Sequence, residues 1–241
     1  MNRWIEFTEA EQSAGRTNSA SRHPSPAIHA HPYRQFFCPL HYEPGYGYPL
    51  LVWLHSDGTD EQQLVRIIPW ISLRNYVAVA PQAPLVCEES GAYCWPDSAC
   101  DSEVWERVRG AIQEATARFA VRPDKVYIAG YERGGTTALR IALEYPEYFA
   151  GAASIQGPFP CHALALVDFE KVRRLPLWVA QGADSHYYPT DRLAEDMRLV
   201  HAAGMTAQFR QYSCGDVIHV RMLQDLNQWL MELSAGCHRI R

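Results

Sequence analysis

The segment Gly130-Tyr131-Glu132-Arg133-Gly134 has the spacing of a turn that exposes a catalytic side chain. In the Gly-x-Ser-x-Gly motif, a sharp turn between a strand and a helix presents its central residue at the top of a sheet. An apolar run precedes the segment and a helical pattern follows it, so the setting fits that turn. The central residue here is Glu132, which raises the question of what chemistry a carboxylate could perform at this position.

Polar residues also follow three other apolar runs that are typical of buried strands. The carboxyl ends of parallel strands meet at one edge of a sheet, so we expect these side chains to gather around Glu132. The candidates are Ser56 and Asp57 after residues 49–54, Asp184 after residues 176–181, and Asp216 and His219 after residues 207–212.

The elements that would carry these residues alternate between strands and helices along the chain. The continuous apolar run Tyr48–His55 is typical of a strand buried on both faces. Amphipathic patterns predict helices over Asp101–Ala120 and from about His219 to Ser234, and Thr190 is expected to cap a further helix. This alternation predicts an α/β fold, with a mostly parallel central sheet and helices on both faces.

Two regions are expected along the chain. Residues 1–32 include a stretch rich in Ser, Ala, Pro and His without apolar periodicity, which indicates a flexible N-terminal arm. Residues 33–241 would form one folded domain.

Composition limits the classes of function. Hydrophobic residues make up 47% of the 241 residues, charged residues make up 20%, and the net charge is −5. Without a basic stripe, a nucleic-acid partner is not expected. No apolar run is long enough to span a bilayer and no signal-peptide core is seen at the N-terminus, so we expect a cytoplasmic protein. The seven cysteines are an odd number without a Cys-x-x-Cys pair, which favours free thiols.

The ordered series of motifs resembles a family. The segments "LLVWLHSDGTDEQQL", "VAVAPQAP", "KVYIAGYERGGTTALRIALEYPEYFAGAASIQGPFP", "LPLWVAQGADSHYYP" and "YSCGDVIHVRMLQDLNQWLM" occur in this order. They resemble small α/β-hydrolases of the carboxylesterase, phospholipase and polyhydroxyalkanoate-depolymerase type. The resemblance covers about residues 33–232. It implies the α/β-hydrolase fold and acyl-transfer chemistry without a cofactor or metal, on a small ester-like substrate.

Each role of this family can be carried over to one position of the chain. A gapless match puts Ser185 at the acid position, and Asp184 is the alternative one residue earlier. The resemblance puts Glu132 at the nucleophile position, Asp216 at the histidine position, backbone N–H groups of Asp57 and Arg133 in the oxyanion hole, Ser56 where glycine is usual, and Tyr93 and Trp95 at the pocket mouth.

Two of these substitutions remove the usual chemistry. A carboxylate at position 132 cannot turn over an acyl group as serine does, because the product would be an anhydride. Asp216 is a poor substitute for an imidazole base, since its ordinary pKa is about 3.9. The sequence therefore predicts an inactive serine esterase that serves as a binding or interaction module.

The turn could still suit a glutamate for structural reasons. A helix N-terminus favours an anion by roughly 0.3–1 kcal/mol. We therefore expect the Glu132 carboxylate to occupy the oxyanion hole, bound by N–H groups of Arg133 and the Ser56–Asp57 segment. This interpretation predicts that Glu132→Gln lowers stability near neutral pH.

Two alternatives remain open at this stage. Glu132 could act as a carboxylate nucleophile or general base, with His219 directing water, although His219 could equally belong to the first turn of a helix. Alternatively, Asp57, Glu132, Asp184 and Asp216 could converge as oxygen ligands for Mg²⁺ or Ca²⁺.

Overall fold

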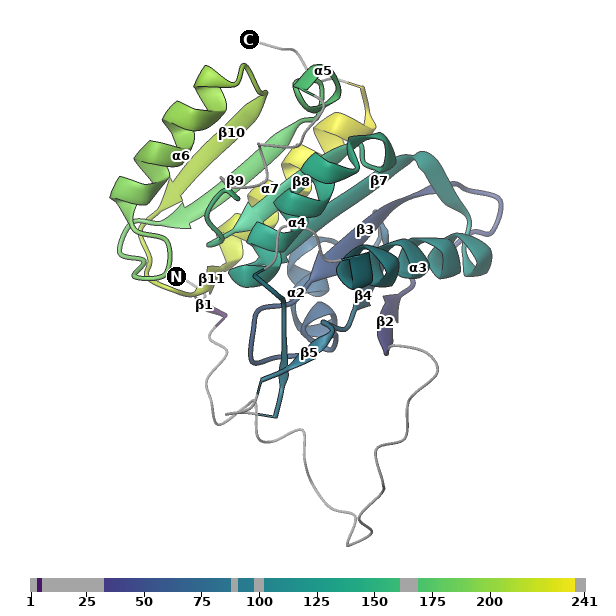
Figure 1. The fold of residues 1–241 in the computed structure, drawn as a ribbon. Coiled ribbons are helices and arrows are strands. Elements are labelled where there is room, and N and C mark those ends of the chain that lie inside the picture. The colour runs from purple at the N-terminus through teal and green to yellow at the C-terminus, as the bar shows by residue number, and fades with distance from the viewer. Residues whose placement is uncertain (1–3, 6–32, 88–90, 98–101, 161–168, 237–241) are drawn as a thin grey trace, which may run out of the picture.

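A seven-stranded sheet forms the centre of the computed structural model (Figure 1). The structure describes residues 4–5, 33–87, 91–97, 102–160 and 169–236. The strand order is β10-β9-β8-β7-β3-β4-β2, and all neighbouring strands are parallel except β2, which runs antiparallel to β4 at one edge. The sheet strands are β2 (Arg34–Phe37), β3 (Tyr48–Leu54), β4 (Val77–Pro81), β7 (Val121–Tyr131), β8 (Gly151–Ile155), β9 (Leu177–Gly182) and β10 (Ala207–Tyr212).

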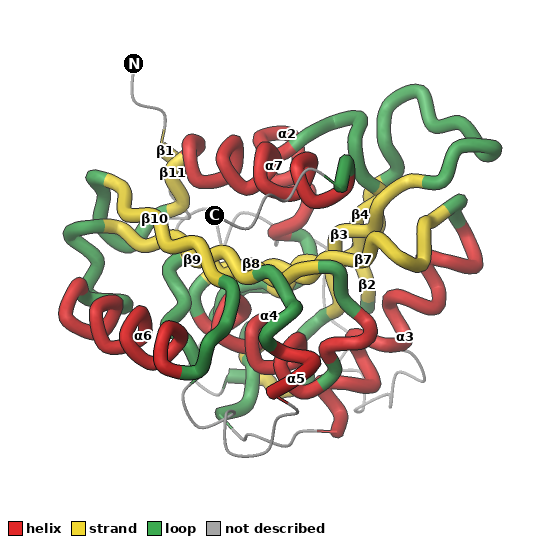
Figure 2. Tube along the Cα trace, turned by 90° about the horizontal axis from the view of Figure 1, so that it is seen from above, coloured by secondary structure: helices red, strands yellow, loops and turns green. Residues whose placement is uncertain are grey.

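Helices cover both faces of this sheet. Figure 2 shows α2 and α7 on one face, and α3, α4, α5 and α6 on the other. The helices are α2 (Gln63–Ile71), α3 (Ser102–Arg118), α4 (Arg133–Glu144), α5 (Phe169–Val172), α6 (Thr190–Ala202) and α7 (Val220–Ser234), with a short 3₁₀ helix η1 (Pro146–Tyr148). Two short antiparallel pairs lie outside the sheet: β1 (Trp4–Ile5) with β11 (Ile218–His219), and β5 (Leu85–Val86) with β6 (Tyr93–Cys94).

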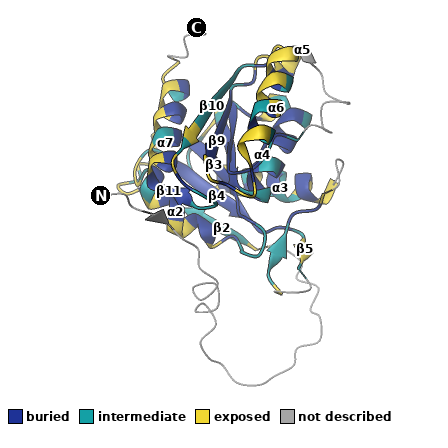
Figure 3. Cartoon of the chain, turned by 90° about the vertical axis from the view of Figure 1, so that its left-hand side faces the viewer, coloured by how far each residue is buried: buried dark blue, intermediate teal, exposed yellow. Residues whose placement is uncertain are grey.

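The apolar core consists of two clusters, one on each side of the sheet. Alternate residues of β3 divide between them: Leu50, Val52 and Leu54 pack on the side of α3 and α4, whereas Leu51 and Trp53 pack on the side of α2 and α7. All seven residues of β3 are buried, as Figure 3 shows for the central strands. A strand buried on both faces reads as a continuous apolar run, which is why Tyr48–His55 could be recognised in the sequence.

The predicted fold class is confirmed, and the element boundaries agree to within a few residues. The helix expected after the Gly130–Gly134 segment is α4, Arg133–Glu144. The predicted N-cap at Thr190 is wrong: Thr190 is the first residue of α6, Pro189 is the N-cap, and the Thr190 hydroxyl donates to the Ala183 carbonyl. The predicted flexible arm, residues 1–32, lies outside the described residues except for Trp4 and Ile5, which pair with β11.

Close backbone contact fixes the turn between β7 and α4. A Cβ atom at Gly134 would collide with the carbonyl oxygens of Leu54 and His55, at the end of β3. A Cβ atom at Gly130 would collide with the backbone of Gly134. The first turn of α4 can therefore lie against β3 and β7 only when both positions are glycine.

We expect Gly134→Ala to lower the free energy of unfolding by about 3 kcal/mol or more, because the colliding atoms belong to the backbone and cannot rotate away. Urea denaturation measures the change. Gly45→Ala is the matched control, since nothing lies within 4 Å of a Cβ at Gly45. Equal stabilities of the two variants would contradict this account of the turn.

Candidate functional site

Glu132 occupies the turn at the carboxyl end of β7, between the ends of β3 and β8. Its backbone has φ 50° and ψ −118°, a left-handed conformation that side-chain-bearing residues rarely adopt. Two hydrogen bonds hold it there: the Glu132 N–H donates to the Ile155 carbonyl at 2.8 Å, and the Thr136 N–H donates to the Glu132 carbonyl at 3.0 Å. The turn thus keeps the strained geometry that presents a side chain at the sheet edge.

The environment of the Glu132 carboxyl disfavours its charged form. Burial, followed by the negative charges of Asp216 and Asp57, raises its pKa from 4.5 to about 7, although a hydrogen bond with the Tyr131 side chain acts in the opposite direction. The neighbouring elements therefore leave Glu132 close to half ionised near neutral pH.

This environment corrects the expected role of Glu132. Its side chain makes no capping hydrogen bond to the first turn of α4, so the part of the predicted oxyanion-hole binding that α4 would supply is not seen. The part predicted for the Ser56–Asp57 segment remains a prediction. A helix N-terminus stabilises an anion by only about 0.3–1 kcal/mol, which is smaller than the cost of burying the carboxylate beside two other acids.

Asp57 and Arg133 contact each other through their side chains. The Arg133 Nε atom lies 3.4 Å from Asp57 Oδ2, and the Arg133 guanidinium also pairs with Asp97. Burial raises the pKa of Asp57, although the hydrogen bond from the Trp95 N–H and the charge of Arg133 oppose that effect. The placement of the backbone N–H groups of Asp57 and Arg133 in an oxyanion hole remains a prediction.

The loop after β6 packs against this part of the site. The Trp95 N–H donates to Asp57 Oδ1 at 2.8 Å, and its indole Nε1–H donates to the His55 carbonyl at 2.7 Å. Trp95 is buried, whereas Tyr93 is half-buried and pairs with Thr59. Trp95 therefore forms an internal wall that holds the segment His55–Asp57 in place. Ser56 is also buried, and its hydroxyl accepts a hydrogen bond from Gln63 Nε2 at 3.0 Å.

Asp216 and Ser185 form the other half of the site. The Ser185 hydroxyl donates to Asp216 Oδ1 at 2.5 Å, and the N–H groups of His186 and Tyr187 each donate to the Asp216 carboxylate at 3.0 Å. Burial alone would raise the pKa of Asp216, but these hydrogen bonds outweigh it and hold the pKa below its usual value. Asp216 is therefore an ionised carboxylate stabilised by protein hydrogen bonds. Its predicted place at the histidine position of the family remains a prediction.

The structure places Ser185, rather than Asp184, against Asp216. Ser185 is buried, whereas Asp184 is exposed, and Asp184 is not among the charges that shift the pKa of Glu132. A turn in which the Ser185 N–H donates to the Gly182 carbonyl at 3.0 Å produces this arrangement. The gapless assignment of Ser185 to the acid position agrees with this contact.

His219 is a helix cap. It immediately precedes α7, is buried, and its Nδ1 atom accepts a hydrogen bond from the Arg221 N–H at 3.2 Å. The charges that act on the Glu132 carboxyl come from Asp216 and Asp57. A role of His219 in directing water remains a prediction.

The arrangement does not support the metal alternative. Within the described ranges, no group of three or more His, Cys, Asp or Glu residues is placed to hold a metal ion. Asp57 is paired with Arg133, and Asp184 is exposed, so the four predicted carboxylates do not form one ligand set.

Sequence analysis missed Gln156, which organises the site. Gln156 follows β8 with φ 59° and is buried. Its side-chain oxygen accepts from the Gly182 N–H at 2.9 Å, and its Nε2 donates to the Gly215 carbonyl at 2.7 Å. One amide thereby joins the ends of β8 and β9 to the loop that carries Asp216. The sequence signal was weak, since a polar residue and a glycine after an apolar run are common at strand ends.

Two tyrosines next to the carboxylates were also missed. The Tyr131 hydroxyl donates to the Asp216 carbonyl at 3.0 Å. Burial raises the pKa of Tyr187 to about 12, with smaller effects from Arg133 and Glu132, so its phenol stays protonated beside them. These hydroxyls add hydrogen-bonding groups that the spacing of the acidic residues could not reveal.

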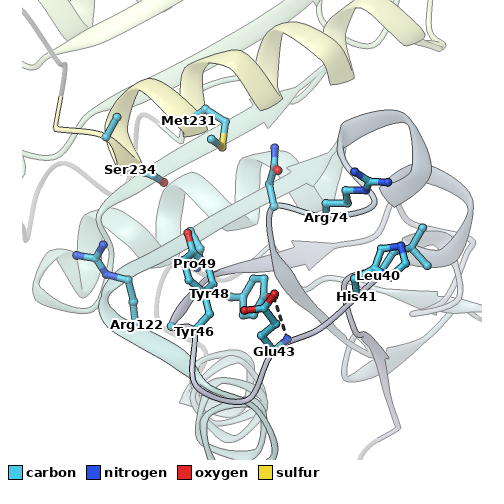
Figure 4. Close-up of a pocket in the computed structure, with 13 residues that line it drawn as sticks. Leu40, His41, Glu43, Tyr46, Tyr48, Pro49, Arg74, Arg122, Met231 and Ser234 are labelled. Carbon is cyan, nitrogen blue, oxygen red and sulfur yellow. Dashed lines mark hydrogen bonds between the residues drawn. The ribbon is translucent and has the colours of Figure 1, made fainter.

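A cavity of about 610 Å³ lies away from this site, at the amino end of β3 (Figure 4). Tyr46, Tyr48, Arg74 and Arg122 line it together with Met231 near the end of α7. In α/β folds the chemistry occurs at the carboxyl ends of the strands, so this cavity is separate from the elbow.

The sequence and the fold are those of an esterase family. Residues 25–238 match the model of the Esterase family, whose description is "Putative esterase". The chain therefore belongs to this family of α/β-hydrolases. None of the described helices has the length and apolar character needed to cross a membrane.

Individual relatives match a smaller part of the chain than the family model does. The chain is 32% identical over 157 residues to "Putative esterase NocK" of Nocardia uniformis subsp. tsuyamanensis. The matched region covers 61% of this chain and 40% of that protein. It is 28% identical over 124 residues to "Probable carboxylesterase SOBER1-like" of Arabidopsis thaliana. This match covers 51% of this chain and 47% of that protein. The chain thus spans less than half the length of either relative. The crystal structure of Arabidopsis thaliana SOBER1 superposes with a TM-score of 0.63 at 21% identity, over 78% of this chain and 100% of that one, which shows a shared fold.

The raised pKa of Glu132 predicts a pH dependence of stability. Between pH 4.5 and about 7 the folded state binds more protons than the unfolded state, so this group makes the fold less stable as pH rises through that window. At about 1.4 kcal/mol per pKa unit, the full effect is on the order of 3 kcal/mol. We therefore expect Glu132→Gln to be more stable than the parent above neutral pH, which reverses the expectation from sequence.

Urea unfolding at about pH 5 and about pH 8 tests this expectation. Asp216→Asn is the matched control with the opposite sign. Its carboxylate has a lowered pKa, so it contributes stability at neutral pH that is lost as the pH falls through the folded-state value. A Glu132→Gln variant less stable than the parent at pH 8 would show that the carboxylate is well paired after all.

Proposed function

We propose that this member of the Esterase family no longer hydrolyses esters through a serine nucleophile and instead acts as a binding or interaction module for a small molecule. The observation that carries the proposal is the elbow itself. Its backbone keeps the strained nucleophile geometry, but the residue it presents is Glu132. The names of the relatives, an esterase and a carboxylesterase, suggest an ester-like or acyl-bearing ligand for the retained site.

The partners of Glu132 support the loss of acyl transfer. A serine hydrolase needs a neutral base that takes the nucleophile's proton. Asp216 is instead a carboxylate with a lowered pKa, whose oxygens accept hydrogen bonds from Ser185, His186 and Tyr187. A carboxylate held in this way has little tendency to take a proton near neutral pH.

The side chains that remain are suited to binding. Glu132 and the hydroxyl of Tyr187 supply hydrogen-bonding groups, and Arg133 supplies a cation already paired with Asp57 and Asp97. A ligand would therefore meet a polar, mainly acidic surface.

We expect the purified protein to hydrolyse p-nitrophenyl acetate no faster than its Glu132→Ala variant, because no serine and no imidazole occupy the catalytic positions. Absorbance of released p-nitrophenol measures the rate. The Glu132→Ala variant corrects for a contaminating esterase, since a contaminant would be unaffected by the substitution. Hydrolysis that disappears in Glu132→Ala would overturn the proposal.

The lost chemistry should be recoverable by restoring three positions together. The contact between Ser185 and Asp216 places an acid at position 185 next to an imidazole at position 216. We expect the triple variant Glu132→Ser, Asp216→His, Ser185→Asp to be acylated by an active-site phosphonate, as detected by intact mass. Each single variant should remain unlabelled, because the members of a triad act as a unit.

The matched control is a second triple variant. It carries Glu132→Ser and Asp216→His as before, but Asp184→Asn in place of Ser185→Asp. Asp184 is an exposed residue outside the site. A correctly folded triple variant that stays unlabelled would mean that the oxyanion segment, with Ser56 and Asp57, is also unable to support the reaction.

A second candidate function rests on the pKa of Glu132. A carboxylic acid with a pKa of about 7 is matched to general acid–base catalysis near neutral pH. In this case Glu132, as base or nucleophile, would act on an ester or alkyl substrate.

If Glu132 is a base, the rate of the reaction should rise through about pH 7 as the carboxylate ionises, and Glu132→Gln should abolish it. A pH–rate profile of any activity detected tests this candidate. A profile that is flat between about pH 6 and about pH 8 would exclude Glu132 as the titrating group.

A further inference from the structure

Two free cysteines lie close together in the hairpin beside the candidate site. Cys87 directly follows β5, Cys94 ends β6, and both thiols are free and half-buried. Leu85 pairs with Cys94 across the hairpin, and the Cys87 N–H donates to the Ala92 carbonyl at 2.7 Å, which continues the antiparallel pairing.

The register places the two thiols on the same face of this hairpin. Side chains alternate between faces along a strand, so Cys87 lies on the face of Leu85, and Cys94 shares that face because it is paired with Leu85. Cys87 and Cys94 are therefore diagonal neighbours. Their side chains are also hydrogen-bonded to each other.

The hairpin is attached to the segment that carries Asp57. The Gly58 N–H donates to the Tyr93 carbonyl at 3.0 Å, and the Tyr93 N–H donates to the Thr59 carbonyl at 3.2 Å. Cys94 stands between Tyr93 and Trp95, whose N–H donates to Asp57. Any covalent restraint at Cys94 would therefore act on the backbone that positions Asp57.

We propose that Cys87 and Cys94 are a modification site that forms a reversible disulfide when a small-molecule disulfide is available as the oxidant, and that this bond restrains the hairpin holding Asp57. The modification is independent of the proposed loss of ester hydrolysis. It requires only the two thiols and their exposure to the oxidant.

The exchange balances in two steps. The Cys87 thiolate attacks one sulfur of the small disulfide, whose S–S bond breaks, and the first small thiolate leaves with the bonding electrons. Cys94 then loses its proton, and its sulfur attacks the Cys87 sulfur and displaces the second small thiolate. Two protein thiols are oxidised, one small disulfide is reduced, and the released protons end on the two small thiols.

The surroundings of Cys94 disfavour its thiolate. Burial, and then the thiol of Cys87, raise the pKa of Cys94. We therefore assign the first attack to Cys87, and the exchange balances in the same way if Cys94 attacks first.

Peptide mapping of the full chain under non-reducing conditions, after incubation with oxidised glutathione, tests the proposal. We expect a linked Cys87–Cys94 species that disappears on treatment with dithiothreitol and does not form in Cys87→Ser. In Cys94→Ser, Cys87 should instead carry one glutathione, because no second thiol displaces it. Cys38→Ser is the matched control, since Cys38 is an exposed free cysteine elsewhere in the fold and its loss should leave the linkage unchanged.

Hydrogen–deuterium exchange measures the second part of the proposal. The peptide containing Gly58 should exchange more slowly in the oxidised protein than in the reduced protein, and Cys87→Ser should show no difference between the two conditions. The proposal is overturned if Cys87 and Cys94 stay unlinked while Cys38 becomes glutathionylated, or if either is linked to another cysteine. The non-reducing peptide map of the unsubstituted protein shows whether Cys87 and Cys94 are linked, even if a variant fails to fold.

Discussion

The backbone contact between the first turn of α4 and the end of β3 is the constraint on which the site depends. Gly134 lies against the carbonyl oxygens of Leu54 and His55, and Gly130 lies against Gly134. This packing sets the path of the chain through the strained turn at Glu132, whatever side chain the turn carries. The turn can therefore carry different side chains at position 132, because the glycines serve the packing of the helix against the strands.

The electrostatics of the edge follow from that geometry. The turn brings Glu132 close to Asp57 on one side and Asp216 on the other. The charge of each carboxyl group is stabilised differently. Arg133 and the Trp95 N–H stabilise Asp57, and Ser185 with two backbone N–H groups stabilises Asp216. Glu132 is left with the Tyr131 side chain and a raised pKa. The least compensated carboxyl is thus the one that the strained turn between β7 and α4 presents.

The sequence was informative where one local rule dominates. Continuous apolar runs identified β3 and β9, and amphipathic patterns identified α3 and α7 to within two residues, because burial on one or two faces directly constrains residue types. Details that depend on tertiary contacts were less accessible. The Glu132 carboxyl was expected to be stabilised by the helix N-terminus, but its environment is decided by Asp57 and Asp216, which come from segments far away along the chain. Gln156 was missed for the same reason, since its partners lie after β9 and β10.

The hydrogen bonds of Gln156 also bear on the order in which the protein assembles. Its amide joins segments separated by 26 and 59 residues along the chain. Closing loops of this length costs conformational entropy before the contacts contribute favourable free energy. Folding must therefore bring β9 and the segment after β10 against β8 before the complete site exists. The turn at Glu132 likewise depends on contacts with β3 and β8, so no single segment of the chain forms the site alone.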